Sequence, residues 1–190
     1  LRAEVNINCL MAKIYLVRHG QSLANLEWKY QGQRYDTDLT ELGKTQASGV
    51  AEKLADKNIE VTLASPLKRA RQTAEIITQI LKISLVFDDL LKETDHGEWS
   101  FLNDNDIKIK WPDLYHLWQT QPSQVTFPNG EDFASETAKR VIDWWQNLDK
   151  NKNTLIVSHE NVMQIIITHI LGQSLDQIWK HRIKNGDVIC

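Results

Sequence analysis

The sequence has 190 residues, a formal net charge of −3 and 42% hydrophobic residues, as expected for an ordinary globular protein of one domain. A chain of this size buries about 70% of its unfolded surface without disulfide staples. Its two cysteines, Cys9 and Cys190, lie at opposite ends. The charge excludes a global basic field for nucleic acid, and no apolar run approaches the roughly 20 residues of a membrane span. We therefore expect a cytoplasmic protein without a nucleic-acid or membrane partner.

The start of the chain does not have the composition of a signal peptide. Glu4, Asn6 and Asn8 interrupt the region that would have to be continuously apolar. Met11 stands directly before the first apolar run. We expect residues 1–10 to be an expression tag or an N-terminal extension, and residues 11–190 to form a single domain.

The first half of the chain predicts three strands and two helices. A helix is expected to begin at Thr40 and to run to Leu54, with its apolar positions three and four residues apart. Ser65 and Pro66 have the residue types of an N-cap and a first helical position, so a second helix is expected from there to Leu81. The expected strands are Lys13–Arg18, Val61–Ala64 and Leu85–Phe87.

The second half continues the alternation of helices and strands. A weak helical pattern over Ile107–Leu117 is interrupted by Trp111 and Pro112, and Gly172 closes the last predicted helix. The other predicted helices are Glu131–Leu148 and Asn161–Leu171, and the other predicted strands are Thr154–Val157 and Val188–Ile189.

This alternation predicts an α/β fold, a three-layer sandwich with a mostly parallel central sheet flanked by helices. Ligands of such sheets bind beyond the carboxyl ends of the strands. Three predicted strands end in polar residues, and parallel pairing would bring these ends to one edge of the sheet. The strand ends are Arg18-His19, Ser65 to Arg69, and Ser158-His159.

Two arginines and two histidines at one edge suit a phosphate monoester. Planar guanidinium groups bind a dianion through paired hydrogen bonds, and Gly20 would let the backbone approach the ligand closely. A neutral, oriented imidazole can attack phosphorus. A nearby carboxylic acid could then protonate the leaving group, for which Glu93, Asp95 and Glu98 are the local candidates.

Five sequence blocks, taken in order, resemble the histidine phosphatase superfamily with its phosphoglycerate-mutase-like fold. Arg-His-Gly alone is a weak signal, but the ordered set is specific and covers about residues 12–189. The blocks are Leu16–Ser22, Asn25–Ala47, Ser65–Ala74, Leu91–Trp99 and Val157–His159.

The resemblance implies a role for each matching residue. It implies that His19 is the nucleophile and forms a phosphohistidine, that Glu93 protonates the leaving group and then activates water, and that His159 completes the catalytic group. The residues implied to hold the phosphoryl oxygens are Arg18, Asn25, Arg69 and His159. Candidates for lining the pocket are Trp28, Gln31, Gly32 and Glu160. The resemblance implies no metal and no other cofactor.

Three positions depart from the family pattern. Ser100-Phe101 stands where Glu-Gly is usual, Asp38 replaces Pro, and Glu160 replaces the Gly after His159. The carboxylate of Glu160 either flanks the helix N-terminus and faces outward, or faces the pocket and opposes the substrate dianion. We expect the outward orientation, because the inward one is unfavourable unless the substrate carries a compensating cation.

We interpret the chain as a metal-independent phosphomonoester hydrolase that acts on a small phosphorylated metabolite; a phosphoprotein is a second substrate class. Two alternatives remain: a mutase that uses the same phosphohistidine, and a non-catalytic phosphate-binding protein. A compact segment between Glu93 and His159 favours hydrolysis, since mutases of the family usually carry an insertion there. No histidine or cysteine pair has zinc-ligand spacing, and His96 is expected to be a hydrogen-bonded structural histidine.

Overall fold

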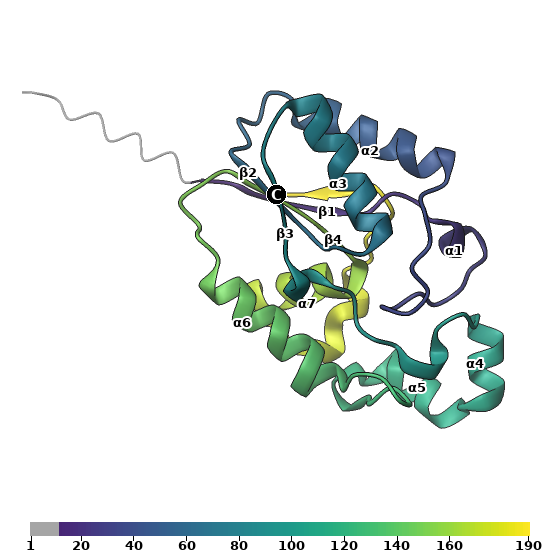
Figure 1. Ribbon diagram of the computed structural model, residues 1–190. Coiled ribbons are helices and arrows are strands. Elements are labelled where there is room, and N and C mark those ends of the chain that lie inside the picture. The colour runs from purple at the N-terminus through teal and green to yellow at the C-terminus, as the bar shows by residue number, and fades with distance from the viewer. Residues whose placement is uncertain (1–11) are drawn as a thin grey trace, which may run out of the picture.

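A computed structural model describes residues 12–190, so the expectations for residues 1–10 and Cys9 lie outside the described residues. Its centre is a five-stranded sheet in the order β3-β2-β4-β1-β5 (Figure 1). Only β5 is antiparallel, and it pairs with β1. The strands are β1 (Ile14–Arg18), β2 (Val61–Ala64), β3 (Leu85–Phe87), β4 (Thr154–Ser158) and β5 (Val188–Ile189). The predicted α/β fold with a mostly parallel sheet is confirmed.

Helices cover both faces of the sheet and give the three expected layers (Figure 1). Tyr15 and Val17 of β1 pack into an apolar cluster with α2 (Glu41–Leu54) and α3 (Lys68–Leu81). Leu16, between them, faces a second cluster with α6 (Lys139–Asn147) and α7 (Glu160–Ile170). This alternation follows from the two-residue period of a strand and explains why β1 is apolar throughout.

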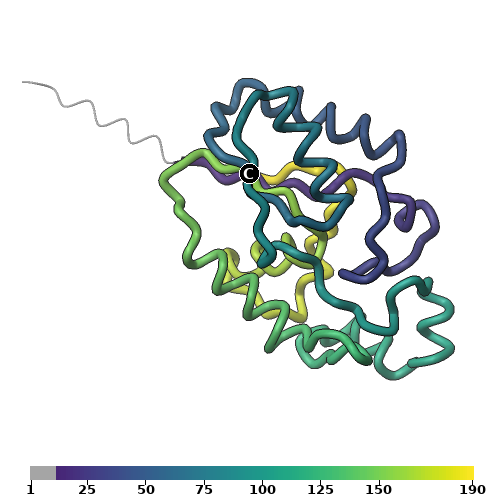
Figure 2. Tube along the Cα trace, viewed as in Figure 1, coloured from purple at the N-terminus to yellow at the C-terminus, as the bar shows by residue number. Residues whose placement is uncertain are grey.

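The remaining elements lie mainly around the carboxyl ends of the strands. In Figure 2 the chain that follows β1 and the chain that carries α4 and α5 lie at the same end of the molecule. The elements are α1 (Leu23–Leu26), α4 (Asp104–Lys110), α5 (Pro112–Thr120), a π-helix (Phe133–Ala138) and 3₁₀ turns at Asp89–Leu91, Gly97–Trp99, Pro122–Gln124 and Leu175–Lys180. No helix within residues 12–190 is both long and apolar enough to cross a membrane.

Two predicted helix starts are wrong. The helix expected from Ser65 begins at Lys68, because the Ser65 hydroxyl accepts a hydrogen bond from the Leu67 N–H (3.3 Å) in a turn before it. The helix expected from Glu131 begins with the π-helix and becomes α6 only at Lys139. By contrast, α2 begins as predicted, with Thr40 accepting the Gly43 N–H at 3.0 Å.

Gly20 lets two segments of backbone pack closely. A Cβ at Gly20 would lie 2.3 Å from the carbonyl oxygen of Gly43 in α2. A Cβ at Gly43 would lie 2.1 Å from the carbonyl oxygen of Gln21. The two glycines therefore let the backbone that follows β1 touch the first turn of α2.

We predict opposite effects for two alanine substitutions in α2. Gly43→Ala should lower the free energy of unfolding by about 1–3 kcal/mol, because its methyl group meets backbone that cannot turn away. Gly49→Ala should raise it by about 0.5–1 kcal/mol, since nothing lies within 4 Å of the added Cβ and alanine favours a helix. Urea denaturation measures the free energy of unfolding of both variants. A Gly43→Ala protein with the free energy of unfolding of the wild type would contradict the packing argument.

Candidate active site

Strand pairing brings the predicted site residues together. Arg18 pairs with Ser158 in the β1–β4 register, and Ala64 pairs with Val157 in the β2–β4 register. The residue that follows each strand therefore lies at one level of the edge. These residues are Ser65, His19 and His159.

The His19 ring has a defined tautomer. Its Nδ1 lies 2.7 Å from the carbonyl oxygen of Gly20, which can only accept, so Nδ1 carries the proton. Its Nε2 accepts a hydrogen bond from Nε of Arg69 at 3.2 Å, which requires a free lone pair. Burial, followed by the charges of Arg69 and Arg18, lowers the pKa of His19 well below its ordinary value. The ring is therefore neutral and presents Nε2.

His159 lies beside His19, with the two ring centroids 5.2 Å apart. Its Nε2 is 2.8 Å from the hydroxyl of Ser65, and its buried Nδ1 has no partner among the described residues. Burial and then the charge of Arg69 lower the pKa of His159 well below its ordinary value. The edge therefore holds two neutral imidazoles.

Arg69 is a cation buried beside both rings. It lies in the first turn of α3 and is 1% exposed. Nη2 donates to the carbonyl oxygen of Gly32 at 2.9 Å, and Nη1 lies 3.5 Å from Oδ1 of Asp36. Burial lowers the pKa of Arg69 to about 10, against the opposing charges of Glu93 and Asp36. The guanidinium thus stays charged at neutral pH without a close carboxylate partner.

The expected outward orientation of Glu160 is wrong. Glu160 lines the pocket, and its Oε2 pairs with Nη1 of Arg18 at 2.8 Å. Nη1 of Arg18 also donates to the carbonyl oxygen of Ile183, which fixes the guanidinium next to Glu160. Arg18 thus gives the Glu160 carboxylate a cation partner inside the pocket, which an outward orientation would not have.

Of the three candidate acids, the structure brings only Glu93 to the pocket. Burial raises the pKa of Glu93, although its Oε1 accepts the Thr94 N–H at 3.0 Å. Asp95 instead pairs with Arg34 at 2.8 Å, and Glu98 pairs with Lys110 at 3.1 Å. Those two carboxylates are engaged with other cations and do not line the pocket.

The pocket encloses about 990 Å³, far more than a phosphate group fills. The other predicted residues line it in different ways. Asn25 uses Oδ1 to accept from the Ser22 N–H (3.1 Å), and buried Gln31 accepts from the Ser22 hydroxyl (2.9 Å). Trp28, 85% exposed, stands at the mouth. Gly32 has φ +51°, and a Cβ there would lie 2.9 Å from the backbone nitrogen of His96.

Sequence reasoning missed two asparagines of the site. The side chain of Asn161 donates to Nε2 of His96 at 3.2 Å, which makes His96 the expected hydrogen-bonded histidine. Asn185, near the C-terminal end, donates to the carbonyl oxygen of His19 (3.0 Å) and to Oδ1 of Asn25 (3.2 Å). In the sequence, Asn185-Gly186 has the residue types of a turn. Nothing in this pattern indicates a contact with His19 and Asn25, which lie 166 and 160 positions earlier.

The loop after Trp99 keeps the backbone course that a glycine would favour. Phe101 stands where the family pattern has Gly, and it has φ +73°, a region that only glycine occupies without strain. Its N–H donates to the carbonyl oxygen of Tyr30 at 2.9 Å, and its ring packs on Tyr35 with centroids 4.6 Å apart. These contacts hold the strained residue in place.

Within residues 12–190 no group of three or more His, Cys, Asp or Glu side chains is arranged to hold a metal ion. Metal independence nevertheless stays a prediction about the reaction, because the arrangement of the chain does not test it.

Comparison with known proteins assigns the family. The chain matches the histidine phosphatase superfamily (branch 1) over residues 14–190 and belongs to it. It is 34% identical over 179 residues to phosphoserine phosphatase 1 of Hydrogenobacter thermophilus, covering 93% of this chain and 84% of that protein. The predicted resemblance is thereby confirmed.

Other relatives widen the range of activities. The chain is 31% identical over 184 residues to the 2,3-bisphosphoglycerate-dependent phosphoglycerate mutase of Bartonella bacilliformis, covering 91% of this chain and 88% of that protein. Among solved structures, YhfR of Bacillus stearothermophilus superposes with a TM-score of 0.85 at 26% identity, covering 92% of this chain and 88% of that one. The family thus includes both phosphatases and mutases of small phosphorylated metabolites.

Proposed function

We propose that this protein is a metal-independent phosphomonoester hydrolase that works through a phosphohistidine on His19. One observation carries the proposal: the Nε2 lone pair of His19 is fixed by the Nδ1–Gly20 contact and lies at the pocket against Arg69. An oriented, neutral imidazole beside two arginines has what a nucleophile toward a phosphate ester needs.

The reaction follows from the positions of these groups. When the phosphate enters, Nε of Arg69 moves its hydrogen bond from Nε2 of His19 to a phosphoryl oxygen, which frees the Nε2 lone pair. Nε2 then attacks phosphorus, the bond from phosphorus to the ester oxygen breaks, and the Glu93 carboxylic acid gives its proton to that oxygen. Arg18, Arg69, Asn25 and His159 bind the phosphoryl oxygens as their negative charge is redistributed. The Glu93 carboxylate then takes a proton from water, whose oxygen attacks phosphorus. The P–Nε2 bond breaks, its electron pair returns to His19, and phosphate is released.

A mutase is the second candidate, and chain length does not exclude it. The chain covers 88% of the Bartonella mutase and 84% of the phosphoserine phosphatase, so overall length does not separate the two activities. The compact segment between Glu93 and His159 supports hydrolysis. A non-catalytic binding protein is the weaker alternative. Such a protein has no need of a carboxyl group with a raised pKa, such as that of Glu93, in the pocket.

Glu160 narrows the substrate class. Its carboxylate lines the pocket beside Arg18, so it neutralises one of the two arginines available to a phosphate dianion. Glu160 thereby weakens the attraction between Arg18 and the phosphate. A substrate with a cationic group near its ester would make up for this loss through its own attraction to the Glu160 carboxylate. The relative named phosphoserine phosphatase has a name that describes such an ester, since phosphoserine carries an ammonium group.

We predict that phosphate is trapped on His19 during turnover. Enzyme quenched while hydrolysing a labelled aryl phosphate should carry an acid-labile, base-stable label on this residue, and His19→Ala should carry none. The rate should be unaffected by excess chelator. Transfer of the label to a second substrate hydroxyl in place of water would identify a mutase, whereas a label on another residue would refute the proposed nucleophile.

We predict that Glu93→Gln slows the hydrolysis of phosphate esters to an extent that depends on their leaving group. Loss of a general acid typically lowers a rate about 10²–10⁴-fold, so kcat/KM should fall far more on an alkyl phosphate than on nitrophenyl phosphate, whose leaving group needs no proton. We compare kcat/KM because it leaves out the dephosphorylation that both esters share. With the alkyl ester, the wild-type rate should fall as the pH rises through the raised pKa of Glu93, and this limb should vanish in Glu93→Gln. Glu98→Gln is the matched control, and equal losses on both esters would reassign the acid.

We predict that Glu160 selects for an ammonium group. O-phosphoserine and 3-phosphoglycerate differ only in that the first carries an ammonium group where the second carries a hydroxyl. The wild type should favour phosphoserine in kcat/KM by about tenfold, because this is the effect expected of one partly screened charge pair. Glu160→Gln should reduce this preference to near one, and it should tighten inhibition by inorganic phosphate because Arg18 becomes free. Glu41→Gln, an exposed change of equal charge on α2, should alter neither value. A preference that persists in Glu160→Gln would contradict the assignment.

A further inference from the structure

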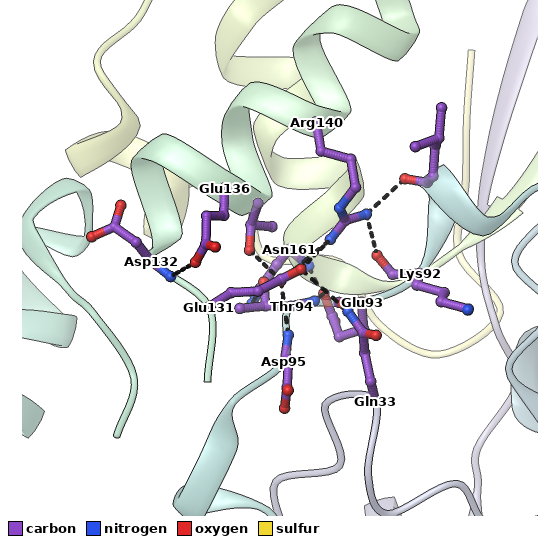
Figure 3. A network of polar contacts seen from close by, with 12 residues as sticks. Gln33, Lys92, Glu93, Thr94, Asp95, Glu131, Asp132, Glu136, Arg140 and Asn161 are labelled. Carbon is purple, nitrogen blue, oxygen red and sulfur yellow. Dashed lines mark hydrogen bonds and ion pairs between the residues drawn. The ribbon is translucent and has the colours of Figure 1, made fainter. Parts of the chain in front are cut away.

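Glu93 is carried by a segment with no regular structure of its own. It lies between the 3₁₀ turns Asp89–Leu91 and Gly97–Trp99 and has no strand neighbour. A side chain on such a segment moves with its backbone unless other parts of the chain fix it. Figure 3 shows that the groups that fix it come from the start of the π-helix, from α6 and from the loop that holds Gln33.

Arg140 of α6 binds the segment before Glu93. Its Nη1 donates to the carbonyl oxygens of Leu90 at 2.7 Å and Lys92 at 2.9 Å (Figure 3). One guanidinium nitrogen therefore bridges two carbonyl groups, that of Leu90 in the 3₁₀ turn and that of Lys92 directly after the turn. A guanidinium makes stronger hydrogen bonds to carbonyls than a neutral donor does.

Glu131 binds the segment after Glu93. Its Oε2 accepts the N–H of Asp95 at 2.9 Å and the hydroxyl of Thr137 at 2.6 Å. The backbone N–H of Glu131 also donates to the carbonyl oxygen of Asp95 at 2.9 Å. Both backbone polar groups of Asp95 are thus bound by one residue.

The two halves are joined into one network. Nη2 of Arg140 pairs with Oε2 of Glu131 at 3.3 Å, and the two side chains are only 17% and 21% exposed. Gln33 completes the network, since its Nε2 donates to the carbonyl oxygen of Glu93 at 2.8 Å and reaches Oε1 of Glu131 at 3.4 Å. Neither Glu131 nor Arg140 lines the pocket, so neither can touch a substrate there.

We propose that Glu131 and Arg140 are positioning residues that hold the carboxyl group of Glu93 at the leaving-group oxygen. The inference rests on the proposed role of Glu93 as general acid. Proton transfer requires donor and acceptor within hydrogen-bond distance, and a misplacement of about 1 Å can cost about 10²-fold in rate. A looser hold on the segment therefore weakens both proton transfers of Glu93, and of these only the transfer to the ester oxygen depends on the leaving group. The attack by His19 is unaffected.

The test compares two esters in each variant. Glu131→Gln keeps the size of the side chain but replaces one acceptor oxygen by an NH₂ group, which must face a donor: the Asp95 N–H, Thr137, Gln33 or Arg140. Arg140→Lys keeps the charge but cannot bridge two carbonyls and a carboxylate. The measured quantity is kcat/KM, because it reports the steps up to release of the alcohol and leaves out the dephosphorylation that the two esters share. In both variants we expect kcat/KM on an alkyl phosphate to fall about tenfold and kcat/KM on nitrophenyl phosphate to fall less than about twofold.

The ester ratio is kcat/KM on the alkyl phosphate divided by kcat/KM on nitrophenyl phosphate, and it separates a positioning role from a loss of stability. Both values come from one sample, so a smaller folded fraction lowers them equally and leaves the ratio unchanged. Glu136→Gln is the matched control: Glu136 lies on the π-helix that follows Glu131 and accepts the Asp132 N–H at 2.6 Å, but it makes no hydrogen bond or ion pair with residues 90–95. Its ratio should equal that of the wild type. An unchanged ratio in Glu131→Gln and Arg140→Lys, with a changed ratio in Glu93→Gln, would overturn the inference alone.

A double variant sharpens the result. Once Glu93 is glutamine, there is no acid left to position, so Glu131→Gln should not change the ester ratio further. If the ratio falls again in the double variant, Glu131 acts by another route and the inference is wrong. If Glu93→Gln itself leaves the ratio unchanged, the proposed acid and the inference that rests on it both fail.

Discussion

The guanidinium of Arg69 is the group on which the rest of the site depends. It is almost fully buried, and its contacts reach His19, the backbone at Gly32 and, more loosely, Asp36. A buried cation of this kind is tolerated only if its donors are satisfied. Its hydrogen bond to His19 requires an unprotonated Nε2, and its charge lowers the pKa of that ring after burial itself. The contact that satisfies a donor of the buried cation is thus also one that keeps the imidazole neutral.

The convergence of the strand ends could be predicted from the sequence. β1, β2 and β4 are short apolar runs that end in polar residues, and parallel pairing leaves few ways to arrange them. The register then places Arg18 opposite Ser158, so the polar residues after the strands must meet at one edge. Periodicity and strand ends carry this information locally, and for this reason the fold and the location of the site were accessible.

Contacts between distant segments could not be predicted. The orientation of Glu160 depends on Arg18, which lies 142 positions earlier and is itself held by the carbonyl oxygen of Ile183. The helix expected at Ser65 begins later because the serine hydroxyl is used at the Leu67 N–H and at His159. In each case a residue type suggested its usual local role, and a partner from another element determined the outcome.

The π-helix shows the same principle at the level of the backbone. A regular α-helix from Glu131 would carry the residues after it in a different rotation, whereas the observed chain caps the π-helix with Asp132 and leaves Glu131 outside it. Glu131 is thereby free to bind Asp95 from the side, and Arg140 follows on α6 within reach of both Glu131 and Lys92. π-helical turns are often found at functional sites. Here the irregular turn lies between two residues of opposite charge, of which Glu131 binds the segment after Glu93 and Arg140 binds the segment before it.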